Sequence, residues 1–215
     1  MLNIQRKITQ VNRTKLTNKR NMWIIIHYVG AVSTAHDNAH YFYSVDRQAS
    51  ANYFVDENEI WQVVEDSDAA WHIGAKKYYN SARNNNSIGI EMCCKRRGTK
   101  GEWYFEPQTI QNTIELTRYL MDKYNIPIER IARHFDCTGK ICPQPWVVDE
   151  TAWNDFLKKV QEVEPMADNE ELTINEKLEK IKEYYNLDEN TANYFRYYRY
   201  NVALIDKLYV KAKNG

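Results

Sequence analysis

The sequence predicts an α/β domain followed by a small all-α module. Short apolar runs typical of strands alternate with helical periodicity up to about residue 163, whereas only helical periodicity follows residue 171. A chain of 215 residues is long enough for one sizeable domain and a smaller second one. Hydrophobic residues make up 43% and charged residues 27%, as in ordinary globular proteins, which argues against a fibrous or disordered chain.

Five stretches of the first domain predict strands, because short apolar runs are bounded there by polar residues. The expected strands are residues 22–26, 51–55, 59–64, 87–94 and 131–134. The first ends at His27, and the second and third flank a polar turn that indicates a hairpin. In the fourth, strand alternation puts Ile88 and Ile90 on one face and Glu91 on the other.

Helical spacing of apolar residues predicts the helices between these strands. We expect helices at residues 36–43, 107–124 and 149–163. The second has Ile110, Ile114 and Met121 on one face, and Pro107 suits its first turn.

The chain turns acidic around Pro165, which places a linker at residues 164–171 between a domain at residues 1–163 and a helical module at residues 172–215. Thr173 and Glu176 form a capping box that opens the first helix of the module. Two further helices, at residues 190–198 and 201–213, are rich in tyrosine.

Charge and hydropathy exclude several functions. The 29 basic and 29 acidic residues cancel, which argues against nucleic acid as a partner. The basic first 20 residues are either a solvated edge or a contact for an anionic polymer. No apolar run is long enough to cross a membrane, and no apolar signal core follows the basic N-terminus. We therefore expect a protein made in the cytoplasm without a signal peptide and not inserted in a membrane.

The four cysteines are expected to be thiols or metal ligands rather than disulfides, because no signal peptide is seen. Cys93 and Cys94 are most simply thiols in or near a strand. Cys137 and Cys142 both follow His134 closely, as zinc ligands can, but Cys137 is the weaker candidate because it falls on a predicted loop before Gly139.

Three motifs carry candidate chemistry: I-I-I-H at residues 24–27, S-I-G-I-E at residues 87–91, and R-H-F-D-C-T-G-K-I-C-P at residues 133–143. A catalytic zinc site uses three protein ligands, often imidazole or thiolate, and leaves a fourth position open. His27, His134 and Cys142 offer such a set. Taken singly, His27 also fits a hydrogen-bonded histidine at a strand end, and Cys142 a small buried hydrophobe.

In this order and spacing, the motifs resemble the type 2 N-acetylmuramoyl-L-alanine amidases, the superfamily of phage amidase lysozymes and peptidoglycan recognition proteins. The resemblance runs from about residue 23 to residue 146 and implies a central mixed β-sheet flanked by helices. It implies that Zn²⁺ is bound by His27, His134 and Cys142. The implied reaction is hydrolysis of the amide bond between N-acetylmuramic acid and L-alanine in bacterial peptidoglycan. The compact layout without a signal peptide favours a phage or prophage endolysin, made in the host cytoplasm and acting on the cell wall.

The resemblance also implies roles for residues near the metal. Glu91 matches a catalytic carboxylate that moves protons, and Lys140 matches a lysine that stabilises an oxyanion. Trp71 and His72 belong to a W-H-x-G stretch that contacts substrate. Each has a structural alternative: an exposed strand glutamate, a solvated lysine or a buried histidine.

One family feature is missing. Some phage members carry a tyrosine on the strand after the first helix, where this chain has Ala51 and Asn52, followed by Tyr53. This departure puts a catalytic tyrosine in doubt and favours Glu91 for proton transfer.

Two other functions stay open. One is a peptidoglycan-binding protein on the same fold that does not cut its ligand. The other is a cysteine peptidase using Cys142, although a position just before Pro143 suits a nucleophile less well than a helix N-terminus. The tyrosine-rich module suggests a further hypothesis, that it docks on the cell wall or mediates self-association.

Overall fold

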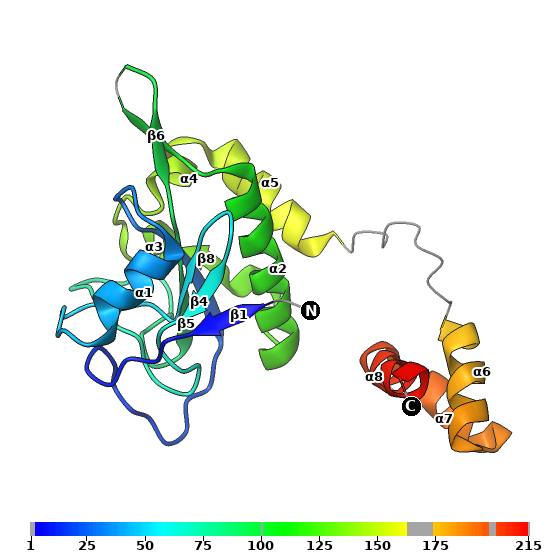
Figure 1. Cartoon of the computed structure of the whole chain (residues 1–215). Helices are drawn as coiled ribbons and strands as arrows, with labels where there is room; N and C mark the ends of the chain where they lie inside the picture. Colours follow the sequence, from blue (N-terminus) through cyan, green and yellow to red (C-terminus); the bar gives the residue numbers. More distant parts are fainter. Residues whose placement is uncertain (1–2, 100, 163–173, 198–200, 215) are drawn as a thin grey trace. The chain divides into compact units, whose positions relative to one another are not determined.

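The structure is a computed structural model that describes residues 3–99, 101–162, 174–197 and 201–214. The chain divides into two compact units, Met1–Val163 and Glu164–Gly215 (Figure 1). The expected linker at residues 164–171 and Thr173 of the expected capping box lie outside the described residues.

The first unit is built on a six-stranded mixed sheet with the order β1-β4-β3-β5-β2-β8. Only β3 and β4 pair antiparallel among its neighbours, as the expected hairpin requires. A separate hairpin is formed by β6 and β7. The strands are β1 (Ile4–Arg6), β2 (Trp23–Tyr28), β3 (Tyr53–Val55), β4 (Ile60–Gln62), β5 (Ser87–Met92), β6 (Lys95–Arg97), β7 (Glu102–Tyr104) and β8 (Ile131–Arg133).

Five helices accompany this sheet: α1 (Ala35–Tyr43), α2 (Pro107–Tyr124), α3 (His134–Thr138), α4 (Gln144–Val148) and α5 (Glu150–Gln161). A single 3-10 turn, η1 (Ile128–Arg130), precedes β8. Pro107 is at the start of α2, and Asn125 ends this helix in a left-handed conformation with φ of 56°. The predicted fold class, a mixed sheet flanked by helices, is confirmed.

Several short elements differ from the sequence expectation. Cys137 lies within α3 rather than on a loop, and His134 is the first residue of α3 rather than the end of a strand. Helices of five residues, such as α3 and α4, make too few turns to show a periodic apolar face. The strands β1, β6 and β7 were not predicted, because each has only three residues, and β1 and β6 are largely polar or charged.

The central strands β2 and β5 separate two layers of side chains. On one face, Ile26, Ile90 and Met92 pack in the main core with α2 and α5, which lie side by side (Figure 1). On the other face, Ile25 packs with Ile73, next to α3. Because both faces are covered, as is usual for parallel strands, residues 24–26 are a continuous apolar run.

The basic N-terminal segment is anchored to the first unit. Arg6 forms an ion pair with Glu65, and Arg13 forms one with Asp68. The ammonium group of Lys19 donates to the backbone carbonyl groups of Asp68 at 2.9 Å and Ser87 at 2.7 Å. These three basic residues therefore serve internal contacts.

The second unit consists of α6 (Ile174–Tyr185), α7 (Glu189–Tyr197) and α8 (Asn201–Asn214), so the prediction of C-terminal helices is confirmed. Its small core contains Leu178, Ile181 and Ile205, with Phe195 and Tyr209 packed against it. Tyr198 and Tyr200 lie outside the described residues, as do the side chains of Tyr194 and Tyr197.

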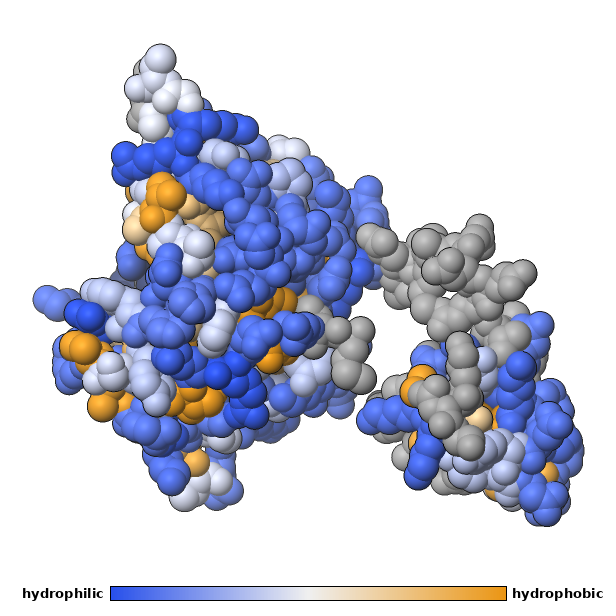
Figure 2. Space-filling model, viewed as in Figure 1, coloured by the Kyte–Doolittle hydropathy of each residue, from blue (hydrophilic) through white to orange (hydrophobic). Residues whose placement is uncertain are grey.

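Hydrophilic residues dominate the face of the first unit seen in Figure 2, with smaller hydrophobic patches between them. Among the helices that the structure describes, none combines the length and the apolar character needed to cross a membrane.

Candidate metal centre

The register of β2 and β5 brings two motifs together. These strands pair in parallel with His27 opposite Glu91. Their neighbours Ile26 and Ile90 are directed into the core beneath α2, so His27 and Glu91 lie on the other face of the sheet. An imidazole and a carboxyl group therefore stand side by side on adjacent strands.

The third motif reaches the same place through β8 and α3. Arg133 lies opposite Ile26, so the next residue of each segment is His134 and His27. The side chain of Asp136 accepts a hydrogen bond from the backbone N–H of Arg133 at 2.8 Å and fixes the start of α3. The N–H of Phe135 donates to the carbonyl of Cys142 at 2.9 Å, which folds the following loop back onto α3.

These contacts gather three donor atoms. Nδ1 of His27 lies 3.1 Å from Nδ1 of His134 and 3.7 Å from Sγ of Cys142. All three ligand atoms lie within 4.8 Å of one another, and all three side chains are buried. Within the described part of the chain, they form a group able to hold a metal ion.

Burial sets the protonation of this group. It lowers the pKa of His134 to about 4 and that of His27 well below the usual range, so both imidazoles are neutral at pH 7. Burial, reinforced by the nearby Glu91, raises the pKa of the Cys142 thiol to about 12. A bound cation would reverse this effect on the thiol, because it stabilises the thiolate.

Glu91 is held in an unusual state for a glutamate. Its Oε2 atom is buried and has no hydrogen-bond partner among the described residues. Burial raises the pKa of Glu91 to about 8, and the positive charge of Lys140 partly opposes this shift. A carboxyl group with a pKa near neutrality can both accept and return a proton.

A cavity of about 280 Å³ opens onto these groups. Lys140 lies on its lining with an exposed side chain, and its charge lowers the pKa values of His27 and His134. Trp71, which also lines the cavity, is half-buried, and its indole N–H donates to the Thr14 hydroxyl at 2.8 Å. Both predicted residues are therefore beside the candidate metal group.

His72 reaches the cavity differently from the predicted substrate contact. It is 8% exposed, and both ring nitrogens are hydrogen-bonded within the protein. Nδ1 lies 2.9 Å from Nε2 of His27, and Nε2 lies 3.0 Å from the Ser87 hydroxyl. Burial lowers the pKa of His72 well below its usual range. Only its ring carbons remain to meet a ligand in the cavity.

Other candidates stand apart from the metal group. The Tyr53 ring is buried in the main core, and its hydroxyl donates to Asp66 at 2.8 Å, so it does not line the cavity. Cys137 is buried and accepts a hydrogen bond from the Asn80 amide at 3.4 Å. The four cysteines are all free in the structure.

Two of the residues near the site that were not singled out from the sequence support the His72 ring. Ser87 binds His72, and Gly89 provides the space in which the His72 ring lies. The signal was present in S-I-G-I-E, since strand alternation puts Ser87 and Gly89 on the same face as Glu91.

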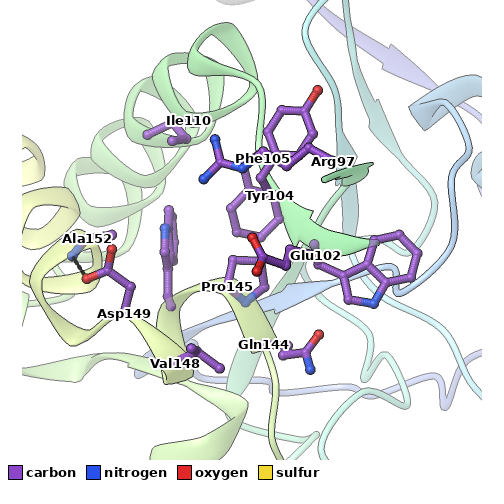
Figure 3. A pocket seen from close by; sticks show the side chains of 12 residues that line it. Arg97, Glu102, Tyr104, Phe105, Ile110, Gln144, Pro145, Val148, Asp149 and Ala152 are labelled. Carbon is purple, nitrogen blue, oxygen red and sulfur yellow. Dashed lines mark hydrogen bonds between the residues drawn. The ribbon is translucent and has the colours of Figure 1, made fainter. Parts of the chain in front are cut away.

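A second, larger cavity of about 440 Å³ lies between the β6–β7 hairpin and helices α2, α4 and α5 (Figure 3). Its described lining contains neither histidine nor cysteine. The carboxylate of Asp149 already accepts the Ala152 N–H at 3.1 Å and caps α5 (Figure 3). The smaller cavity has the concentrated chemistry and is therefore the candidate site.

Fold and site together define an α/β domain that sets a buried group of two histidines and one cysteine beside a carboxyl group of raised pKa. The chain belongs to the N-acetylmuramoyl-L-alanine amidase family, whose profile (Amidase_2) matches residues 17–145. The predicted family membership is confirmed.

Known proteins similar to this chain agree with this assignment. The chain is 31% identical over 165 residues to N-acetylmuramoyl-L-alanine amidase CwlL of Bacillus licheniformis, a match covering 72% of this chain and 44% of that protein. The chain spans less than half the length of the first curated relatives that it matches.

Two solved structures share the fold. A mutant endolysin from Bacillus subtilis is 27% identical, with 74% of this chain and 99% of the other covered and a TM-score of 0.61. The amidase AmiD from Escherichia coli is 26% identical, with 76% and 65% covered and a TM-score of 0.53. AmiD was solved with anhydro-N-acetylmuramic acid-L-Ala-D-γ-Glu-L-Lys as its substrate.

Proposed function

We propose that this protein is a zinc-dependent N-acetylmuramoyl-L-alanine amidase that cleaves the bond between N-acetylmuramic acid and L-alanine in bacterial peptidoglycan. One observation carries the proposal: the β2–β5 register sets Glu91 directly beside a buried group of three metal donors. The family assignment and the names of the relatives support the same reaction.

The three donors fit zinc. Zn–N bonds of about 2.0–2.1 Å and Zn–S bonds of about 2.3 Å imply, in a tetrahedron, N···N and N···S separations of roughly 3.3 and 3.6 Å. Two of the three separations are close to these values, at 3.1 Å for His27 to His134 and 3.7 Å for His27 to Cys142, and all three donor atoms lie within 4.8 Å of one another. Two imidazoles and one thiolate are also a ligand set that zinc favours, and they leave a fourth position for substrate or water.

A zinc ion bound by His27, His134 and Cys142 would supply Lewis-acid chemistry, by which an amide carbonyl is polarised and water becomes more acidic. Glu91 supplies the proton transfers. Its carboxylate takes a proton from the attacking water as the new C–O bond forms, and its carboxyl group returns a proton to the alanine nitrogen as the C–N bond breaks. In the metal-free protein, burial raises the pKa of Glu91 to about 8, and a nearby cation would lower this pKa toward neutrality.

Lys140 completes the proposed chemistry. Its side chain lies at the same cavity, and its ammonium group would stabilise the negative charge that develops on the carbonyl oxygen. The half-buried Trp71 offers an aromatic surface to the sugar or to the stem peptide. The ligand bound by AmiD supports an N-acetylmuramoyl peptide as the class of substrate.

The two alternative functions receive less support. A cysteine peptidase needs a thiolate nucleophile, whereas burial raises the pKa of the Cys142 thiol to about 12. A binding protein without activity would not need the complete donor group or the carboxyl group beside it.

We infer the biological setting from the relatives. Similarity to an endolysin from Bacillus subtilis supports a phage or prophage endolysin, made in the host cytoplasm and acting on the cell wall. This assignment predicts that the purified protein degrades the walls of intact cells when it is added to them from outside.

The C-terminal unit is proposed to dock on the wall. Lys180, Tyr184 and Tyr209 line a cavity of about 480 Å³ on this unit, and the Tyr184 side chain is 48% exposed. Glu183 also lines this cavity, so the proposal rests on the tyrosine rings, which suit the sugars of the wall polymer. Tyr184→Ala in the full chain should reduce co-sedimentation with purified walls. Loss of a larger oligomer instead would indicate self-association, and no change in either would end the hypothesis.

The deciding experiment is digestion of purified peptidoglycan by the full chain. We expect new N-terminal alanine without new reducing sugar, with loss of activity after metal removal and recovery on adding zinc. New reducing ends would indicate a glycosidase. The absence of both products would favour a binding protein. Chelator-resistant cleavage that requires Cys142 would indicate a cysteine peptidase.

A further inference from the structure

A continuous chain of hydrogen bonds runs from the backbone to the candidate metal group. The Ser87 hydroxyl lies 2.7 Å from the carbonyl oxygen of Arg83 and 3.0 Å from Nε2 of His72. Nδ1 of His72 then lies 2.9 Å from Nε2 of His27. The other nitrogen of His27, Nδ1, faces the Cys142 thiol at 3.7 Å. The chain thus ends at a donor atom of the metal group.

The direction of this chain is set at its first member. The Arg83 carbonyl can only accept, so the Ser87 hydroxyl donates its one hydrogen there. The Ser87 oxygen is then an acceptor, and Nε2–H of His72 donates to it. A neutral imidazole has a single N–H, so Nδ1 of His72 carries a lone pair and accepts from Nε2–H of His27.

We propose that His72 and Ser87 are positioning residues that fix the tautomer of His27, so that its Nδ1 lone pair faces the metal group before a metal arrives. This inference rests on the proposed zinc site. It gives the W-H-x-G stretch a role behind the metal ligand. Hydrogen bonds of this kind orient histidine ligands in metal sites generally.

The surroundings hold His72 in this position. The Asn84 side-chain oxygen accepts from the backbone N–H groups of His72 at 3.2 Å and Ile73 at 3.0 Å. Gly89 leaves room for the imidazole, since a Cβ atom there would lie 2.7 Å from Cγ of His72. His27 is 1% exposed and His72 8% exposed, so water competes little for the bond between them.

Three residues on one face of β5 therefore contribute to the site. Ser87 supplies the acceptor, Gly89 the space and Glu91 the carboxyl group, at alternate positions of one strand. A purely packing role for His72 would need its ring shape but neither nitrogen. This difference makes the two roles separable by experiment.

The variants are Ser87→Ala, which removes the acceptor, and His72→Phe, which keeps a planar ring but removes both nitrogens. Thr113→Val is the matched control, because the Thr113 hydroxyl is also buried and donates to a backbone carbonyl, at 2.7 Å, but lies on α2 in the main-core layer. Zinc affinity is measured by competition with a chromophoric chelator. The His27 tautomer in metal-free wild type is measured by long-range ¹⁵N–¹H NMR.

We expect the Nε2–H tautomer of His27 in the metal-free wild type. Zinc affinity should fall by about 10- to 100-fold in His72→Phe and by about 10-fold in Ser87→Ala, with Thr113→Val unchanged. The Nδ1–H tautomer in wild type, or unchanged affinity in a folded Ser87→Ala variant, would overturn the inference. If His72→Phe does not fold, the NMR result and Ser87→Ala decide. Tight zinc binding without amidase activity would contradict the proposed function instead.

Discussion

The two faces of the β2–β5 strand pair share one backbone but differ in role: one packs in the hydrophobic core, and the other carries the candidate site. On the face toward α2, Ile26 and Ile90 are fully buried among apolar side chains. On the other face, His27 and Glu91 are adjacent residues of the same strands, and they carry buried polar atoms. Burial of apolar side chains on the first face stabilises the fold. Burial of a carboxyl group and imidazoles on the second face costs part of that stability, because these polar groups lose contact with water.

This difference explains why stability and activity should respond separately to substitution. Adjacent residues of one strand belong to different layers, because side chains alternate across the sheet. We call the face with Ile26 and Ile90 the α2 face and the face with His27 and Glu91 the site face. Residues of the α2 face should therefore control the free energy of unfolding, and residues of the site face should control metal binding and turnover.

The sharpest contrast is expected from the metal ligands. His27→Ala and Cys142→Ser should each lose stoichiometric zinc and at least about 10⁴-fold in amidase activity, because the polarising ion is gone. Zinc content by atomic absorption and release of N-terminal alanine measure the two effects. A variant that kept amidase activity without zinc would show that metal binding by these residues is not needed for catalysis.

Glu91→Gln should separate proton transfer from metal binding. The amide keeps the shape of the carboxyl group but cannot exchange a proton, so activity should fall by about 10²- to 10⁴-fold. Zinc should stay bound, since Glu91 is not one of the three donors. Turnover and zinc content are compared in the same preparation, and zinc loss in this variant would argue that Glu91 is a ligand.

Ile90→Ala tests the opposite face one residue away. Removing a fully buried isoleucine side chain should cost about 2–5 kcal/mol of unfolding free energy, against about 0.5–1.5 kcal/mol for Ile90→Val. Urea denaturation measures the loss. Turnover of the folded fraction should stay near wild type, and a large loss of turnover at intact zinc content would break the separation between the faces.

The pH dependence of stability should belong to the site face. In metal-free protein, the pKa of His134 is about 4, below the 6.5 of a free imidazole, so the unfolded chain binds more protons between these values. The contribution of His134 to stability should therefore fall by about 3 kcal/mol as the pH drops from 6.5 toward 4. Glu91, whose pKa is raised to about 8, contributes with the opposite sign, so the His134 contribution is read from the difference between wild type and a His134 variant.

Chemical denaturation of metal-free protein across this range gives the slope. His134→Gln should lose less stability than wild type between pH 6.5 and pH 4, whereas Ile90→Ala should lower the whole curve without changing its slope. Equal slopes in wild type and His134→Gln would show that burial does not hold this histidine neutral.

The sequence predicted the parts of the fold that repeat a pattern over many residues. The helix at residues 107–124 was placed with its full bounds, and Ile88 and Ile90 were assigned to the face opposite Glu91. Short elements such as α3 were not predicted, because five residues contain little periodicity. Cys137 was therefore put on a loop although it is helical.

The candidate site was predictable to a similar degree. Motif order and spacing named His27, His134 and Cys142, which the fold brings together. The hydrogen-bond chain through His72 was not predictable, because it depends on how the W-H-x-G loop crosses β5 at Gly89. Distances between side chains on separate segments are set by tertiary packing, which spacing along one sequence does not record.

The β2–β5 register has a consequence for quality control during synthesis. A slip of β2 by one residue against β5 would turn His27 toward α2 and Ile26 toward the cavity. Such a chain would lose its hydrophobic core and its metal-binding group at the same moment. A stable but inactive misfolded form is therefore disfavoured, and the molecules that survive proteolysis in the cell should be the ones competent to bind metal.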